Sequence, residues 1–337
     1  MSSLDVTVLG AGSWGTALTH LLARQGHRVR LWAREDEVVE GINRGRKNPL
    51  FLSEADLPEG VTATGDLGAA VQGAEMVLVV IPSQHVRSHM VAVRDDLPAR
   101  IPVVICSKGI EQGTLCTMHQ VLEEELPGKH HEGISVLSGP SFALEVVRRN
   151  PTNVTVAARS QAMAEQVQRA IATRDFRVYS STDILGVELG GALKNVIAIA
   201  AGAADGLGFG HNSKAGLMTR GLAEITRLAV TMGGRPETMA GLAGMGDLIL
   251  TCTGDLSRNR QVGQLLAGGK TFAQIRAEMR QVAEGVATSV SVHSLAAREA
   301  VDMPISEQVY RALHEDKPVP DAMETLLARS LKPEWDL

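Results

Sequence analysis

Hydrophobic and polar positions change their period once along this chain, near residue 182. Before that point, short β-branched runs alternate with amphipathic stretches such as 16–24 and 162–172. The runs predict strands at 6–9, 28–32, 76–81, 103–106, 134–137, 153–157 and 176–180. Several are almost wholly apolar, as expected for strands covered on both faces. The alternation predicts a parallel sheet with helices on both sides.

Beyond residue 182 the pattern is helical, and glycine-rich breaks such as 241–247 and 267–270 separate some of the segments. The predicted helices are 184–204, 213–232, 257–267, 286–299, 304–315 and 319–329. We therefore predict two domains, an α/β domain at 1–185 and an all-helical domain at 186–337.

Composition narrows the function classes. The 337 residues are 44% hydrophobic and 21% charged, a balance typical of a soluble globular protein. The net charge of −5 argues against a nucleic-acid partner. The cysteines, Cys106, Cys116 and Cys252, are odd in number and lack metal-type spacing, so we expect a reducing cytoplasm and no metal. We see neither a signal peptide nor an apolar run of about 18 residues, so we expect no membrane span.

A glycine-rich loop follows the first predicted strand. Gly10, Gly12 and Gly15 form a G-x-G-x-x-G pattern that opens a helical segment. The first glycine permits a tight turn, the second lets a pyrophosphate approach the backbone, and the third lets helix and strand pack closely. In this context the pattern favours a Rossmann-like dinucleotide-binding domain over a merely structural turn, with the phosphates at the helix N-terminus.

The end of the second strand bears on cofactor choice. Arg34 lies at its tip, and Glu35 and Asp36 come directly after it. An acidic residue there would bind the ribose 2′-OH of NAD, whereas an arginine suits the 2′-phosphate of NADP. We interpret the two acids as first-turn residues of the next helix, where its dipole favours them. Arg34 then predicts a preference for NADPH, with NADH as the alternative.

Two further strand ends carry candidate ligand contacts. Lys108 follows one predicted strand, and Gly139, Ser141 and Ala143 follow another. Ligands of open α/β sheets bind at the carboxyl ends of the strands. The alternatives are a solvated loop lysine and a turn that ends in a helix cap at Ser141.

A lysine and an asparagine, Lys194 and Asn195, interrupt a stretch of glycine, alanine and isoleucine. On a helix, the neighbours of Lys194 at spacings of three and four are Gly190, Gly191, Ile197 and Ala198. The small residues suggest room for a ligand beside the ammonium. Desolvation there would lower the lysine pKa toward the range useful for proton transfer, unless a carboxylate restores it. The alternative is a lysine whose head reaches water.

The segment 244–260 supplies possible partners. Asp247 lies in a glycine-rich turn and could orient the lysine. Ser257, Arg258 and Asn259 open the next predicted helix, with a cap at Asp255 or Ser257. An arginine at a helix N-terminus suits a phosphate, because a bidentate donor joins oriented N–H groups. An ordinary capped helix explains the same residues equally well.

Taken together, these segments resemble the bacterial NAD(P)-dependent glycerol-3-phosphate dehydrogenases over nearly the whole chain. The matching segments, in the family's order, are GAGSWGTAL, SGPSFALEV, ELGGALKNVIAIAAGAADGLGFGHNSKA, GLAGMGDLILTCTGDLSRNR, VAEGVATS and MPISEQVY. The resemblance implies reversible reduction of dihydroxyacetone phosphate to sn-glycerol 3-phosphate, for phospholipid synthesis in the cytoplasm.

The resemblance also implies roles for individual residues. Lys194 would be the general acid/base, assisted by Lys108 and Asp247. The substrate would be surrounded by Lys108, Gly139, Ser141, Lys194, Asp247, Ser257, Arg258 and Asn259. Besides the glycine loop, the residues lining the cofactor would be Ser13, Trp14, Arg34, Lys108, Ala143, Arg258, Val282 and Glu284.

Two other functions fit the same organisation. A β-hydroxyacid or sugar-acid dehydrogenase also joins a dinucleotide domain to a helical one that bears a catalytic lysine. The phosphate-type cluster at 257–259 favours a phosphorylated ketone instead. A redox-sensing module that binds NADPH without catalysis would not need Lys194, Lys108 and Asp247 together. The apolar helices of the second domain are compatible with a homodimer.

Overall fold

The computed structural model describes residues 3–279, 283–331 and 333–334. The chain forms two compact units. Unit 1 comprises Met1–Lys108 and Cys116–Val187, and unit 2 comprises Gly109–Leu115 and Glu188–Leu337. The single boundary expected near residue 185 omits one feature, because the short segment Gly109–Leu115 belongs to unit 2. Ser291 binds this segment by donating its hydroxyl to the carbonyl oxygen of Ile110 at 2.9 Å.

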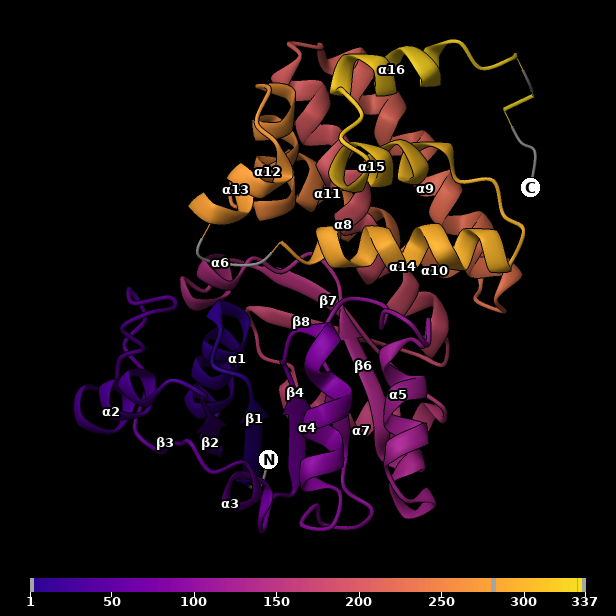
Figure 1. Ribbon diagram of the computed structural model, residues 1–337. Helices are drawn as coiled ribbons and strands as arrows, with labels where there is room; N and C mark the ends of the chain where they lie inside the picture. The colour runs from indigo at the N-terminus through magenta and orange to yellow at the C-terminus, as the bar shows by residue number, and fades with distance from the viewer. Residues whose placement is uncertain (1–2, 280–282, 332, 335–337) are drawn as a thin grey trace. The chain divides into compact units, whose positions relative to one another are not determined.

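An eight-stranded sheet forms the centre of unit 1 (Figure 1). Its strand order is β3-β2-β1-β4-β5-β6-β7-β8. The strands are β1 (Asp5–Leu9), β2 (Arg28–Trp32), β3 (Val61–Thr64), β4 (Met76–Val79), β5 (Val103–Ile105), β6 (Ile134–Ser138), β7 (Thr152–Ala158) and β8 (Phe176–Ser181). Strands β4, β5 and β6 are buried at every position, as the apolar runs predicted.

The sheet departs from the prediction in two ways. It is mixed rather than wholly parallel, because β7 pairs with β6 in the antiparallel direction while β8 runs parallel to β7. The chain returns from β6 through residues 139–151, which hold a five-residue helix instead of a full crossover helix. Strand β3 was not predicted, because its sequence VTAT is short and buries only Ala63.

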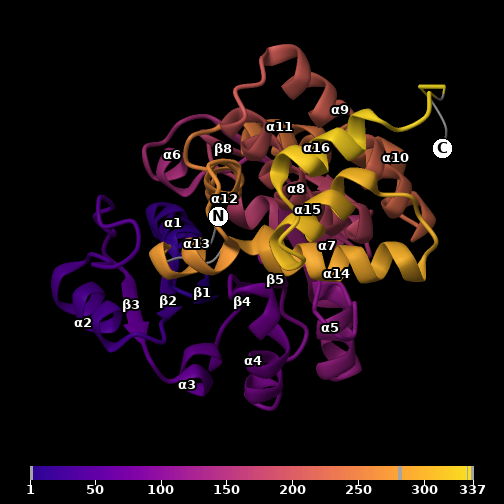
Figure 2. The same cartoon turned by 45° about the horizontal axis from the view of Figure 1, so that its top comes forward.

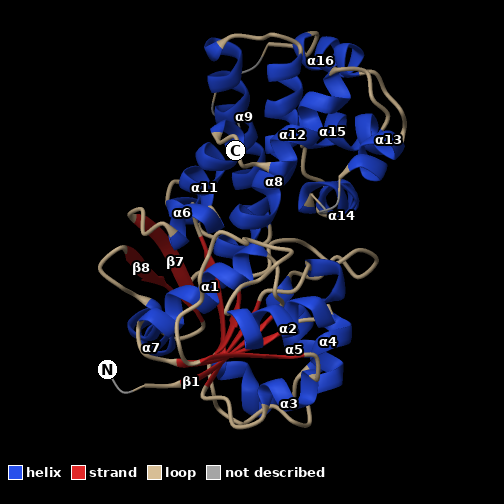
Figure 3. Ribbon diagram, turned by 90° about the vertical axis from the view of Figure 1, so that its left-hand side faces the viewer, coloured by secondary structure: helices blue, strands red, loops and turns tan. Residues whose placement is uncertain are grey.

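Helices cover both faces of the sheet in unit 1, as the edge-on view of Figure 3 shows. They are α1 (Ser13–Arg24), α2 (Asp36–Gly45), α3 (Leu67–Val71), α4 (Val86–Val93), α5 (Met118–Glu125), α6 (Ala143–Val147) and α7 (Gln161–Ile171), with 3₁₀ turns η1 (Ser83–His85) and η2 (Gly128–Gly133). The core between helices and strands includes Val8, Leu18, Leu31 and Leu78, each completely buried. Burial of this apolar surface is the main favourable contribution to the folding free energy of unit 1, and the folded sheet fixes the positions of the strand ends.

From Glu188 on, the described part of unit 2 consists of helices and their connecting loops (Figure 2), whereas its segment Gly109–Leu115 is not helical. Its elements are α8 (Ile184–Gly206), which begins in unit 1, then α9 (His211–Thr231), α10 (Pro236–Met239), the π-helical segment η3 (Leu242–Gly246), α11 (Asp247–Thr253), α12 (Arg258–Ala267), α13 (Phe272–Glu278), α14 (Glu284–Arg298), α15 (Pro304–His314) and α16 (Val319–Leu327). The six predicted helices are present. We missed α10, η3, α11 and α13, because the glycines at 241–246 and 268–269 indicate breaks.

Helix α8 is the core of unit 2. It is the one described helix long and apolar enough to cross a membrane, but 94% of its most apolar window is buried inside the protein, the position of a core helix. Its small residues let other backbones approach closely. A Cβ at Gly202 would lie 1.9 Å from the carbonyl oxygen of Arg260, and one at Gly263 would lie 1.9 Å from that of Ile199. Helices α8 and α12 therefore pack backbone to backbone.

Candidate active site

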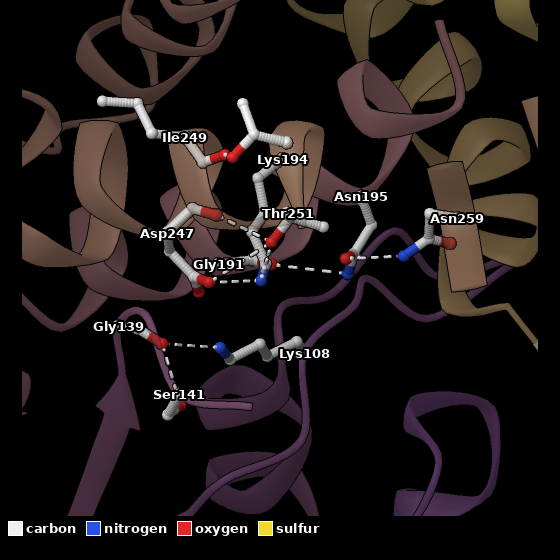
Figure 4. Close-up of polar contacts among 11 residues, drawn as sticks. Lys108, Gly139, Ser141, Gly191, Lys194, Asn195, Asp247, Ile249, Thr251 and Asn259 are labelled. Atoms are coloured by element: carbon white, nitrogen blue, oxygen red, sulfur yellow. Dashed lines mark hydrogen bonds and ion pairs between the residues drawn. The ribbon is translucent and has the colours of Figure 1, made fainter. Parts of the chain in front are cut away.

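Lys194 lies in the middle of α8 and is buried, with 7% of its surface exposed. Its Nζ forms an ion pair with the Asp247 carboxylate and donates a hydrogen bond to Thr251 Oγ1 at 2.7 Å (Figure 4). Asp247 and Thr251 are 1% and 4% exposed. A buried ammonium is costly unless it is paired, and here a carboxylate and a hydroxyl together fix its position.

Local structure explains how these partners reach the lysine. Asp247 is the first residue of α11, and Thr251 lies one turn later on the same helix. The Thr251 hydroxyl donates to the backbone carbonyl oxygen of Asp247 at 2.7 Å, so its lone pairs face the Lys194 ammonium. Asp247 was expected in a turn, but a carboxylate in the first turn of a helix also gains from the helix dipole.

One of the two glycines beside Lys194, Gly190, packs against a neighbouring backbone and leaves no space for a ligand. A Cβ at Gly190 would lie 2.6 Å from the Ala243 carbonyl oxygen, so the backbone of η3 fills this position. Close packing of η3 against α8 is what delivers Asp247, the next residue along, to the lysine. Gly190 therefore serves the ion pair rather than a cavity.

The N-terminus of α12 carries the cluster Ser257, Arg258 and Asn259. Ser257 is the helix cap, because its Oγ accepts a hydrogen bond from the backbone N–H of Arg260 at 3.3 Å. The Ser257 hydroxyl keeps its proton available to donate. Arg258 is exposed, whereas Ser257 and Asn259 are buried.

Asn259 connects three helices. Its Nδ2 donates to Asn195 Oδ1 on α8 at 2.9 Å, and its Oδ1 accepts the backbone N–H of Gly285 on α14 at 2.9 Å. A Cβ at Gly285 would lie 2.6 Å from the Asn195 carbonyl oxygen, so only glycine permits this approach. The sequence cluster is thus anchored by tertiary contacts.

A second charged network fixes α12. Asp205, near the end of α8, accepts a hydrogen bond from Arg260 Nε at 2.6 Å and forms an ion pair with Lys214 at 2.5 Å. Burial would raise the pKa of Asp205, but these two cations outweigh burial and hold the pKa below its ordinary value. Arg260 also pairs with Asp255 at 2.9 Å.

In unit 1, Lys108 and Ser141 converge on one peptide. Lys108, after β5, donates from Nζ to the Gly139 carbonyl oxygen at 3.3 Å. Ser141 Oγ donates to the same oxygen at 2.9 Å (Figure 4). Gly139 has a φ of +141°, and a Cβ there would lie 2.9 Å from the Val154 Cα. The parallel strands β5 and β6 bring these residues to one edge of the sheet.

The glycine loop fits a dinucleotide. Gly10 has a φ of +115°, and a Cβ there would lie 2.7 Å from the Val80 carbonyl oxygen. A Cβ at Gly15 would lie 1.8 Å from the Gly10 carbonyl oxygen, so α1 packs directly on the loop. A Cβ at Gly12 meets nothing within 4 Å, which leaves open space where a pyrophosphate would approach.

At the end of β2, Arg34 pairs with Glu35, whose Oε1 lies 2.8 Å from the arginine Nη2. Glu35 is the residue preceding α2, and Asp36 is its first residue, so only Asp36 has the expected first-turn position. Arg34 is 80% exposed along its side chain.

The remaining predicted residues belong to helix starts. Ser13 and Trp14 open α1, Ala143 opens α6 and Glu284 opens α14. Val282 lies outside the described residues. The structure groups Lys194 with Asp247 in unit 2, and Lys108 with Gly139 and Ser141 in unit 1.

Sequence reasoning missed Thr251 and assigned no role to Asn195. Thr251 follows Asp247 by four residues, a spacing that would have placed both on one helix face had α11 been predicted. Within the described ranges, no cluster of three or more His, Cys, Asp or Glu side chains could hold a metal ion.

Comparison with known proteins gives a consistent result. The family described as NAD-dependent glycerol-3-phosphate dehydrogenase matches with its N-terminal part over residues 5–164 and with its C-terminal part over residues 183–324. A protein of Geobacter sp. (strain M21), named glycerol-3-phosphate dehydrogenase with NAD(P)+, is 54% identical over 98% of both chains. A Myxococcus xanthus protein of the same name is 51% identical over 97% of this chain and 98% of its own.

The fold agrees with that result. The crystal structure of glycerol-3-phosphate dehydrogenase from Coxiella burnetii aligns with a TM-score of 0.92 at 38% identity, covering 97% of this chain and 99% of that one.

Proposed function

The chain belongs to the NAD-dependent glycerol-3-phosphate dehydrogenase family, and we propose that it reversibly reduces the C2 ketone of dihydroxyacetone phosphate to sn-glycerol 3-phosphate with NADPH or NADH. The Lys194 ammonium, held by Asp247 and Thr251, is the observation that carries this proposal. The named relatives and the phosphate-type cluster at 257–259 favour it over the sugar-acid dehydrogenase alternative.

Charge explains the role of Lys194. When bound, the reduced nicotinamide supplies a hydride to C2 of the substrate. The ketone oxygen gains negative charge in that step, and Lys194 donates a proton to it. Asp247 pairs with the ammonium and orients it, and Thr251 fixes it from a second direction. Lys108 is a further proposed contact of the substrate.

The phosphate of the substrate needs donors away from C2. We propose that Ser257, Arg258 and Asn259 bind it, together with the N–H groups that open α12. Gly139 and Ser141 contribute from the loop after β6. Binding energy from this remote group orients the reacting carbon and so lowers the barrier.

The cofactor contacts follow the glycine loop and the strand ends of unit 1. We propose that Gly10, Gly12 and Gly15 receive the pyrophosphate and that Arg34 meets the 2′-phosphate of NADPH. The other proposed contacts are Ser13, Trp14, Lys108, Ala143, Arg258, Val282 and Glu284. Further proposals are a cytoplasmic location, a supply of glycerol phosphate for phospholipids, and a homodimer, which sedimentation velocity would test.

A direct assay tests the function. The purified protein should oxidise NADPH or NADH when dihydroxyacetone phosphate is added, and should not reduce NADP+ with 6-phosphogluconate. Lys194→Ala should lower kcat by about 10²–10⁴-fold, the usual contribution of a positioned proton donor. It should bind nucleotide like the wild type.

A matched lysine provides the control. Lys270 lies in the same unit and pairs with Glu278 on the surface at 2.6 Å. Lys270→Ala should leave kcat unchanged. If the wild type consumes neither nucleotide with dihydroxyacetone phosphate, the proposed function is wrong. A sensor without catalysis would instead bind nucleotide and show no turnover.

A further inference from the structure

Asn48 is a completely buried polar residue in the loop after α2, and the proposed function does not use it. Its Nδ2 donates to the Ala11 carbonyl oxygen at 2.8 Å and to Thr16 Oγ1 at 2.8 Å. Its Oδ1 accepts the backbone N–H groups of Leu50 at 3.1 Å and Phe51 at 3.0 Å. Both donors and both acceptor positions of one side-chain amide are therefore engaged.

These partners fix the orientation of the amide. The two N–H groups of the loop require an acceptor, and the Ala11 carbonyl requires a donor, so exchanging oxygen and nitrogen would lose these three contacts, and only the Thr16 hydroxyl could adapt. The contacts join the loop at 48–51 to the glycine loop, 37 residues earlier in the sequence. A buried amide with all its bonds made is a rigid connection, because breaking one leaves a buried polar group unsatisfied.

The atom that Asn48 holds is part of the nucleotide loop. Ala11 lies between Gly10 and Gly12, and its carbonyl belongs to the peptide that carries the Gly12 N–H. A trans peptide is planar, so its C=O and N–H point in opposite directions. Fixing the Ala11 carbonyl on the buried amide therefore turns the Gly12 N–H away from the core. Gly12 is exposed, and the space beside its Cα is open.

We propose that Asn48 is a positioning residue for the nucleotide. It holds the Ala11–Gly12 peptide so that the Gly12 N–H already faces the pyrophosphate before binding. A preorganised donor binds more tightly than one that must reorient. This inference rests on the proposed function, and it concerns NADPH and NADH alike, because both carry the pyrophosphate.

Asn48→Asp is the sharpest variant, because it has nearly the same shape. Its carboxylate still accepts from Leu50 and Phe51 but cannot donate to Ala11 or Thr16. The dissociation constants of NADPH and NADH, measured by fluorescence titration without substrate, should both rise about tenfold or more. At saturating nucleotide, kcat and the KM for dihydroxyacetone phosphate should stay within about twofold of wild type.

Acid should partly rescue this variant. A protonated carboxyl group recovers one donor for the Ala11 carbonyl. The dissociation constant of NADP+ for Asn48→Asp, relative to wild type, should therefore approach one as the pH is lowered. A defect that is only structural would stay constant or grow in acid.

A matched control separates positioning from general stability. Asn43, on α2 of the same unit, makes the same kind of connection: its Nδ2 donates to the Ala63 carbonyl oxygen at 2.9 Å, and its Oδ1 accepts the Ala63 N–H at 2.8 Å. Asn43→Ala should lower Tm and leave nucleotide affinity unchanged.

Thr16→Val provides an independent test if Asn48→Asp does not fold. Thr16→Val removes one partner of the amide without changing shape and should weaken nucleotide binding a few-fold, whereas Thr16→Ser should bind like wild type. Folded Asn48→Asp or Thr16→Val with wild-type affinity for both nucleotides would overturn the inference. A wild type that binds neither nucleotide would instead overturn the proposed function on which the inference depends.

Discussion

The two lysines proposed to meet the substrate are held in different ways. Lys194 of unit 2 is buried in a helix, and its partners are two side chains that lie 53 and 57 residues later in the sequence. Lys108 of unit 1 is half-buried after a strand, and it donates to a backbone carbonyl oxygen 31 residues away. The position of Lys194 depends on an ion pair. The position of Lys108 depends on the edge of the sheet where the parallel strands β5 and β6 end.

The two lysines differ in how the free-energy cost of desolvating the ammonium is offset. Removing one partner of a buried ion pair leaves an uncompensated charge and costs about 3–5 kcal/mol. A half-exposed ammonium keeps water as a partner, so its long hydrogen bond to the Gly139 carbonyl oxygen contributes little. We therefore expect the largest effects of mutation around Lys194, and smaller ones at the exposed nucleotide end of unit 1.

After Lys194→Ala itself, Asp247→Asn should give the largest effect. The amide keeps the shape but not the charge, so the buried Lys194 ammonium loses its counter-ion. We expect kcat to fall by roughly 10²-fold and the free energy of unfolding to fall by about 3 kcal/mol or more. Steady-state kinetics and denaturant unfolding measure the two. Thr251→Val, which removes only a hydroxyl group, should have a smaller effect on both.

The control is another ion-paired acid of unit 2. Glu307 pairs with Arg311 at 2.7 Å and with His293 at 2.6 Å, and it is partly exposed. Glu307→Gln should leave kcat unchanged. Equal losses of kcat in Asp247→Asn and Glu307→Gln would mean that burial of the ion pair does not matter for turnover.

Glu224 is as buried as Asp247, but its carboxylate accepts hydrogen bonds from uncharged donors instead of pairing with a cation. It accepts from the backbone N–H of Ile305 at 2.7 Å, and from the N–H and hydroxyl of Ser306 at 3.1 Å each, at the start of α15. Burial outweighs these hydrogen bonds and raises the pKa of Glu224 to about 7. A pKa that is higher in the folded state means that the folded protein holds the proton more tightly than the unfolded chain.

Glu224 makes the folded state less stable as the pH rises. Stability from this group is complete below its unfolded pKa near 4.5 and is lost as the pH rises toward 7. The loss is roughly 3 kcal/mol. Glu224→Gln should remove this part of the slope when unfolding free energies are measured across that range. A variant with the wild-type slope would contradict the assignment.

Arg34→Ala should give the smallest effect. Arg34 is exposed and already paired with Glu35, so its contact with a 2′-phosphate is screened by water. We expect the KM for NADPH to rise about tenfold or less and the KM for NADH to stay constant. Glu35→Gln should shift the ratio the other way. An NADH preference that Arg34→Ala leaves unchanged would contradict the proposed NADPH preference.

Sequence patterns predicted some parts of the molecule and missed others for identifiable reasons. The apolar strands and long amphipathic helices were predicted because each one shows its own period. Strand β3 and helix α11 were missed, since VTAT is short and the glycines before Asp247 indicate a break. The antiparallel direction of β7 was also missed, because alternation of strands and helices does not record the direction of a strand.

The sequence by itself determined the glycine loop, the family resemblance and the residue types around Lys194, because backbone sterics and side-chain chemistry are local properties. Tertiary structure decided what those residues touch. The backbone of η3, rather than a ligand, packs against Gly190. Thr251 contacts the Lys194 amine, and every polar atom of the Asn48 amide is hydrogen-bonded. Close packing and complete hydrogen bonding of buried groups join distant segments, and no local period carries that information.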